Sequence, residues 1–378
     1  NSFQIACSNG ILVYACQNTL QDRRMNSNYY VIVKSNNRTG KVGMASIRDV
    51  ARRAGVGVGT VSRVINGTGY VSADTRKKIE SAIEELQYKP NELARNLFRN
   101  KTGIVGILVP DVDHPFFSSY VRQTEAALYE MGYKTLIGNT IGISNREREF
   151  LDMLDRNMVD GIITGSHTLE GDEYLKRKKT IVSLDRDFGS GIPMVGSDHM
   201  SGGEMAANIL IKNKCKKVLN ISGVAPDIAA NDRHAILETI LTEHGVEVID
   251  VIMEWNKFGH EDYWETARKA MQKCDGIDGV FGAAQPALYY MHLAMEAGRK
   301  VPDDFKVVTY DGTDITRLCY PEATSICQNI EMLAEISANS VVDLIEERRP
   351  VPHKQIIPVE VKAETNLRAK SLKTYQEK

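Results

Sequence analysis

Two long series of short apolar stretches alternating with amphipathic stretches constrain the fold of this chain more than any other feature. The apolar stretches have the length of strands, and those between them have helical periodicity. Strands that alternate with helices form parallel sheets covered on both faces. The series therefore predict an α/β body of two doubly wound lobes. We expect strands at 104–109, 135–138, 161–164, 180–184, 217–222, 246–253, 279–283 and 306–310, and helices near 117–131, 146–157, 202–213, 232–244, 262–273 and 286–297.

Residues 44–90 have another pattern, that of a small all-α domain. Ser46, with an acidic residue three positions later, has the form of a helical N-terminus. Apolar residues at helical spacing then lead to Gly55, where a helix-ending glycine belongs. A second helical stretch comes after Gly57, and Ser72 is placed to cap a third. Two short helices joined by a glycine turn and braced by a third predict a helix-turn-helix, whose second helix can enter the major groove of DNA.

The sequence Gly57-Val58-Gly59 also permits a rival interpretation as a dinucleotide-binding loop. Such a loop comes directly after a strand and usually has a third glycine. Here a charged helical stretch precedes it, and Ser62 stands in the third place. The helix-turn-helix is the better interpretation.

The charge distribution separates the head from the rest of the chain. Residues 44–101 hold 11 Lys/Arg and 6 Asp/Glu, whereas residues 102–378 hold 31 Lys/Arg and 42 Asp/Glu. A basic head on an acidic body suits a protein whose head alone contacts the phosphates of DNA. A chance imbalance in a short segment is the plainer alternative.

Residues 1–43 lack the helical and strand periodicity of the rest of the chain, and Met44 opens the strongly patterned sequence. We expect Met44 to be the natural start. Residues 1–43 would then be a disordered leader, translated from upstream sequence or left from cloning. A genuine disordered basic arm is the alternative.

The six cysteines, at positions 7, 16, 215, 274, 319 and 327, form no cluster with zinc spacing. No apolar run approaches the roughly 20 residues of a membrane span. The short apolar run within residues 1–43 also lacks the basic flank of a signal peptide. We therefore expect a cytoplasmic protein with reduced thiols in the body, no metal, no cofactor and no membrane partner.

The ordered match of the head identifies it as similar to the lactose-repressor (LacI/GalR) family of transcription regulators. The head reads IRDVARRAGVGVGTVSRVING, then VSADTRKKIESAIEELQYKPNELARNL, and the resemblance continues to about residue 365. In the body, VDGIITGSHTL is most similar to the sucrose-operon repressors of Gram-positive bacteria.

The resemblance implies a periplasmic-binding-protein-like body in which the chain crosses between lobes near residues 201, 330 and 353. It divides the chain into a head at 44–90, a hinge helix and linker at 91–102, a two-lobed effector-binding and dimerisation domain at 103–365 and a charged tail at 366–378.

The resemblance also implies DNA contacts. Val58, Gly59 and Arg63 fall where the family reads bases, and arginine pairs well with guanine edges. Leu97 matches a hinge leucine that wedges into the minor groove. The plainer alternatives are a solvated arginine and a packing leucine. The DNA-binding candidates are Ser46, Val58, Gly59, Thr60, Ser62, Arg63, Asn66, Asn91, Ala94 and Leu97.

The chain departs from the family pattern at the start of its second helix. The family usually has serine where Gly57 stands and larger side chains at positions 58 and 59. Gly59 offers no side chain to a base, so readout should depend on Val58, through a thymine methyl, on Arg63 and on the hinge.

Small ligands bind near the carboxyl ends of parallel strands. This rule selects Asp185, Asp311, Pro110-Asp111 and the stretch His114-Pro115-Phe116-Phe117 that follows the first strand. The resemblance adds Arg233 and a pocket aromatic, Phe116 or Phe117, and sugars need both hydrogen-bonding groups and an aromatic face. A simple turn at Asp311 and core packing of Phe117 are the plainer alternatives. The effector-binding candidates are Phe116, Phe117, Ser166, Asp185, Arg233, Gln285 and Asp311, with His167 and Asp198 as weaker ones.

A second departure concerns the ligand. The family often has a polar pair where this chain has Ala283-Ala284, so two potential hydroxyl partners are missing. The effector would be smaller, differently oriented or not the usual free sugar, and Gln285 could compensate.

The leading functional hypothesis is a repressor of carbohydrate-utilisation genes, controlled by a sugar or sugar phosphate between the lobes. A homodimer, with a tetramer left open, would present two heads to a near-palindromic operator DNA. A transport sugar-binding protein is the first alternative; the head and the missing export signal argue against it. An enzyme is the second, but no GxSxG, HExxH or Walker sequence is present, and no catalytic residue is expected.

Overall fold

The computed structural model divides into two units, Asn1–Glu92 and Leu93–Lys378, which are described separately. The structure describes the backbone of residues 3–8 and 11–16, and then residues 45–88, 101–141, 145–166, 168–177, 180–189, 191–223, 228–254, 259–273 and 275–362.

Two antiparallel strands, β1 (Phe3–Ser8) and β2 (Ile11–Cys16), stand in the leader. Whether the leader as a whole is disordered stays a prediction. Residues 17–43 lie outside the described residues, and the origin of the leader stays a prediction.

The head consists of α1 (Ile47–Ala54), α2 (Val58–Asn66) and α3 (Ala73–Glu85), as the sequence predicts. The Asp49 carboxylate accepts hydrogen bonds from the backbone N–H and the hydroxyl of Ser46, at 3.0 and 2.7 Å, and so fixes the start of α1. Gly55 ends α1 at φ 69° and Gly67 ends α2 at φ 65°, both left-handed. Between the helices lies one small core, formed by Val50, Ala51, Val61, Val64, Ile79 and Ala82.

The first lobe of the body is a parallel sheet in the order β13-β7-β6-β5-β3-β4. Its helices α5 and α13 pack on one face, while α6 and α7 pack on the other. Its elements are β3 (Ile104–Val109), α5 (Pro115–Glu130), β4 (Lys134–Asn139), α6 (Arg146–Asp155), β5 (Gly161–Thr164), α7 (Gly171–Leu175), β6 (Ile181–Leu184), β7 (Met194–Ser197), α13 (Ile330–Glu346) and β13 (Lys354–Ile357).

The second lobe has the sheet order β14-β12-β11-β10-β8-β9, parallel except that β14 runs antiparallel to β12. Its helices α8 and α9 cover one face, and α10 and α11 cover the other. Its elements are α8 (His199–Lys212), β8 (Lys217–Gly223), η1 (Ala229–Asn231), α9 (Asp232–Glu243), β9 (Glu247–Met253), α10 (His260–Lys273), β10 (Gly279–Ala283), α11 (Ala284–Glu296), β11 (Lys306–Asp311), α12 (Ile315–Leu318), β12 (Thr324–Cys327) and β14 (Glu360–Lys362).

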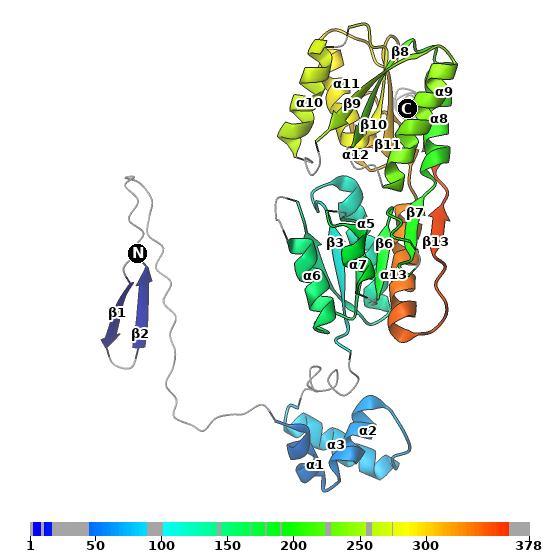
Figure 1. Ribbon diagram of the computed structural model, residues 1–378. Coiled ribbons are helices and arrows are strands. Elements are labelled where there is room, and N and C mark those ends of the chain that lie inside the picture. The colour runs from blue at the N-terminus through cyan, green and yellow to red at the C-terminus, as the bar shows by residue number, and fades with distance from the viewer. Residues whose placement is uncertain are drawn as a thin grey trace, which may run out of the picture. The chain divides into compact units, whose positions relative to one another are not determined.

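The chain passes between the lobes three times, from β7 to α8, from β12 to α13 and from β13 to β14 (Figure 1). The first two crossings agree with the expected positions near 201 and 330. The third lies between Ile357 and Glu360, later than 353, because residues 354–357 pair with β7 in the first sheet. The two doubly wound lobes of the predicted fold class are confirmed.

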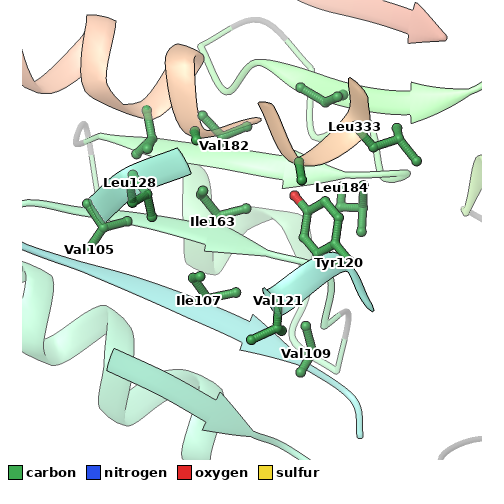
Figure 2. Packing of buried hydrophobic residues seen from close by; sticks show 14 of the residues in the cluster. Val105, Ile107, Val109, Tyr120, Val121, Leu128, Ile163, Val182, Leu184 and Leu333 are labelled. Atoms are coloured by element: carbon green, nitrogen blue, oxygen red, sulfur yellow. The ribbon is translucent and has the colours of Figure 1, made fainter. Parts of the chain in front are cut away.

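The main core of the first lobe lies between its sheet and the helices α5 and α13. Figure 2 shows Val105, Ile107 and Ile163 of the strands beneath Tyr120 of α5 and Leu333 of α13. Side chains separated by some two hundred positions in the sequence thus share one buried layer. No helix in the described parts of the chain is long and apolar enough to cross a lipid bilayer.

Candidate DNA-reading helix and interlobe pocket

The second helix of the head has an inward and an outward face. Val61 and Val64 are buried against the other helices, whereas Val58 is 42% exposed and Arg63 is exposed. Within residues 45–88, Arg52 and Arg53 form ion pairs with acidic side chains and Arg63 forms none. The outward face of α2 therefore presents an apolar group and a cation to a partner.

The other DNA-binding candidates of the head fall around this face. Gly59 and Asn66 are exposed and Thr60 is half-buried on α2, while Ser46 is exposed at the start of α1. The Asn66 amide donates to the Ser62 hydroxyl at 3.1 Å, so this pair braces the helix. Three candidates, Asn91, Ala94 and Leu97, lie outside the described residues, and the hinge helix stays a prediction.

Gly59→Ala should stabilise α2 by about 1 kcal/mol, because alanine loses less backbone entropy in a helix than glycine does. An added Cβ at Gly59 meets no atom within 4 Å. Gly55→Ala is the matched control: position 55 has the same open space but φ 69°, so alanine there should destabilise the helix end. Native-state hydrogen exchange of the α1 and α2 amides in the full chain measures both. If both variants changed the protection of the helix amides in the same direction, this account would be contradicted.

A cavity of about 180 Å³ lies between the two lobes of the body. It is lined by residues at or just beyond the carboxyl ends of strands from both sheets. Pro110 and Asp185 come directly after β3 and β6 of the first lobe, and Met253, Ala283 and Asp311 end β9, β10 and β11 of the second. The strand-end rule applied to the sequence therefore finds this pocket.

Five of the seven effector-binding candidates meet at this cavity. Asp185 and Asp311 approach from opposite lobes, and Arg233 enters from the first turn of α9. Phe116 is mostly core, only 4% exposed, while the half-buried Phe117 packs edge-on against it with ring centroids 5.2 Å apart.

The remaining candidates are placed elsewhere. Ser166 is buried behind the cavity and shares a hydrogen bond of 2.6 Å with the hydroxyl of Thr140. Gln285 lies in the first turn of α11 and is not among the residues that line the cavity, and its role in replacing the polar groups missing at 283–284 stays a prediction. Asp198 caps α8 by accepting a bond from the Ser201 N–H at 3.0 Å. His167 lies outside the described residues.

Both candidate acids have strained backbones. Asp185 has φ 58° and Asp311 has φ 83°, in the left-handed region that residues other than glycine seldom adopt. Such outliers gather at ligand sites, where the surrounding structure enforces them. Each acid is also nearly buried, at 8% and 4% exposure, so its carboxylate faces the cavity rather than bulk water.

The electrostatics of the pocket lower the pKa of Asp185 and the pKa values of two lining histidines. Burial alone would raise the pKa of Asp185, but the nearby His199, the Ser197 N–H and Arg233 bring this pKa below its ordinary value. Burial lowers the pKa of His114, and burial together with Arg233 lowers the pKa of His234 well below its ordinary value. The guanidinium of Arg233 lies 4.1 Å from the centroid of the Tyr310 ring, a cation–π contact that fixes its position.

Several lining residues were not among the candidates. Tyr263 sits on α10, where its apolar spacing is typical of a core residue, whereas His114, which the strand-end rule selects, also lines the cavity. Gln328 donates to an oxygen of Asp311 at 2.9 Å. The sequence contains no local signal for Tyr263 or Gln328, because the topology alone brings them to the cavity. Among the described residues no group of His, Cys, Asp and Glu is arranged to hold a metal ion.

Known families and relatives match both units. Residues 46–91 match the family "Bacterial regulatory proteins, lacI family", and residues 207–363 match "Periplasmic binding protein-like domain". The sucrose operon repressor of Streptococcus mutans is 34% identical over 322 residues, covering 84% of this chain and 97% of that protein. The ribose operon repressor of Bacillus subtilis is 32% identical over 306 residues, covering 81% and 93%.

Solved structures share the fold. The lac repressor dimer bound to operator and the anti-inducer ONPF superposes with a TM-score of 0.75 at 23% identity, over 86% of this chain and all of that one. The cellobiose complex of the transcriptional regulator CelR gives a TM-score of 0.60 at 26% identity, over 84% and 98%. With relatives above 30% identity along nearly their whole length and the family's own head at residues 46–91, this chain belongs to the lacI family of bacterial regulatory proteins.

Proposed function

We propose that this DNA-binding transcription regulator represses carbohydrate-utilisation genes. A sugar bound between its lobes would either release the regulator from its operator DNA or retain it there. The observation that carries the proposal is the convergence of Asp185, Arg233 and Asp311 on one cavity from two lobes. A ligand that contacts both lobes makes different contacts in each arrangement of the lobes, so it binds one arrangement more tightly than the other. Only such a difference in affinity can shift the equilibrium between the two conformations.

The chemistry of the pocket suits a polyhydroxylated ligand. The two carboxylates accept hydrogen bonds from hydroxyls, and the guanidinium donates to hydroxyl, ring or phosphate oxygens. Phe117 and Tyr263 offer ring surface for the apolar face of a sugar. Support also comes from the relatives, which are named for sucrose and ribose operons, and from the CelR complex with cellobiose.

On the DNA side, we propose that α2 enters the major groove with Val58 and Arg63 toward the base edges. Two protomers in a homodimer, or in a tetramer of two such dimers, would present two heads to a near-palindromic operator. The hinge candidates Asn91, Ala94 and Leu97 would complete the contact in the minor groove. This regulation would take place in the cytoplasm, because the operator DNA and the sugar are both present there.

The test combines DNA selection with ligand screening on the full chain. Duplexes selected from a random pool should converge on one near-palindromic sequence. Ribose, fructose, sucrose, cellobiose and the phosphate esters of the first two are then added in turn. A bound ligand at 100 times its dissociation constant should stabilise the protein by about 2.7 kcal/mol, and it should change affinity for the selected DNA. Failure of any duplex to be enriched would refute DNA reading, and the absence of any ligand effect would refute a sugar effector drawn from this panel.

A further inference from the structure

A continuous series of buried contacts connects the two sides of the pocket. Asp185 of the first lobe receives a hydrogen bond on Oδ1 from His199 Nε2 at 2.9 Å. His199 opens α8 of the second lobe, and its Nδ1 lies 3.0 Å from the hydroxyl of Tyr310. The other end of the series is Arg233, whose guanidinium lies 4.1 Å from the Tyr310 ring centroid. Both ends are cavity-lining residues, whereas His199 and Tyr310 do not line the cavity.

The protons of this series have fixed places. A carboxylate only accepts hydrogen bonds, so Nε2 of His199 carries a proton toward Asp185. Burial raises the pKa of Tyr310, which therefore keeps its hydroxyl proton. His199 is 2% exposed and Tyr310 is fully buried, so water does not compete for these bonds.

His199 is the main support of the Asp185 carboxylate. The other contact to Oδ1 is the Ser197 N–H at 3.3 Å, a long bond. The backbone of Asp185 is also tied to the second lobe, because its carbonyl accepts from the Ala229 N–H at 2.9 Å. Without His199 the main chain would stay in place while the carboxylate lost its strong partner, and a buried carboxylate without partners is costly.

We propose that His199 is a positioning residue, which aims the Asp185 carboxylate at the effector and connects it through Tyr310 to Arg233 on the opposite lobe. The inference rests on the proposed function, since it concerns the same effector site. A hydrogen bond between a ligand hydroxyl and Asp185 would then change the interactions of Arg233. The change would pass through His199 and Tyr310, which do not contact the ligand.

Three variants separate this role from simple stabilisation of the fold. His199→Phe keeps the ring volume and removes both nitrogens. His199→Gln restores one donor and one acceptor at similar reach. Tyr310→Phe removes only the hydroxyl. The matched control is His292→Gln, because His292 does not line the cavity and pairs with Glu296 at 3.3 Å on the surface of α11, where its side chain is 61% exposed.

Calorimetry on the full chain with ribose, fructose, sucrose, cellobiose and the phosphate esters of ribose and fructose gives the decisive comparison. For the sugar that binds, His199→Phe should weaken affinity about tenfold and Tyr310→Phe about threefold. The double variant should be no weaker than His199→Phe alone, because Tyr310 acts through His199. His199→Gln should recover affinity to within about threefold of the wild type, and His292→Gln should change nothing. The proposal would be overturned if the losses of sugar affinity in the two single variants multiplied in the double variant. It would also be overturned if His199→Gln recovered no sugar affinity.

A second measurement needs no ligand. Nitrogen-15 NMR of histidine-labelled full chain should show a proton on His199 Nε2 that exchanges slowly with water, assigned by its loss in His199→Gln. A bare Nε2 would overturn the proposal whatever the sugars do. If no sugar of the panel binds the wild type, the proposed effector class fails and the role of His199 fails with it. If a sugar binds wild type and His199→Phe equally, only the role of His199 fails.

Discussion

Asp311→Ala and Arg233→Ala should each lower effector affinity at least about tenfold while operator binding without effector stays intact. A buried hydrogen-bonding group left without its partner costs roughly 1–3 kcal/mol, and about 1.4 kcal/mol corresponds to one factor of ten. Asp311 also receives the bond from Gln328, so its loss leaves two groups unsatisfied, the amide and the ligand hydroxyl. In cells, an inducing effector would no longer release the variants from the operator, and a co-repressing one would no longer retain them there.

The measurement is paired: calorimetry with the sugar that binds the wild type, and binding of the selected DNA in its absence. Asp314→Ala is the matched control, because this carboxylate lies three positions along the same turn with a side chain 91% exposed. Normal effector affinity in both variants would remove Asp311 and Arg233 from the site. Loss of DNA binding by the unliganded variants would instead show that they support the fold.

Arg63→Ala should weaken specific DNA binding by roughly 1–3 kcal/mol, the value of one bidentate contact between arginine and a base. Binding of the sugar should be unchanged, since Arg63 belongs to the head and the pocket to the body. Lys77→Ala removes the same charge from α3 and serves as control. It should leave sequence preference unchanged, because the loss of one positive charge weakens attraction to the DNA backbone whatever the base sequence.

Competition between the selected duplex and variants of it at single base pairs distinguishes the two effects. Arg63→Ala should lose discrimination at one position of each half-site, whereas Lys77→Ala should keep it. An Arg63→Ala protein with wild-type sequence preference would exclude Arg63 as a reader of bases.

Burial on both faces explains why much of the body could be predicted from its sequence. Strands such as β3 are covered by helices on either side and so are apolar throughout, which leaves a plain signal. The short strands β7 and β12 have serine within them and escaped prediction. The strands β13 and β14 are short and mostly exposed, so they lack the apolar run that marks the buried strands.

The site was predictable only as far as strand ends determine it. Asp185 and Asp311 were found because each lies at or directly after the end of a parallel strand. Ser166 was a candidate from its loop position, which does not fix where its hydroxyl points, and this hydroxyl turns to Thr140. His199 opens a helix, and nothing in its sequence neighbourhood reveals that its ring faces Asp185 from another lobe.

The late position of α13 in the chain determines when the first lobe can fold during synthesis. Its helix α5 ends at Glu130 and packs against α13, which begins at Ile330. A ribosome adding about 5–20 residues each second needs roughly 10–40 seconds to bridge that interval. Throughout this time the head is complete, while the apolar side of α5 has no cover and the nascent chain is a target for chaperones. Termination of translation just after β12 would therefore leave the first lobe without α13 and prevent it from folding.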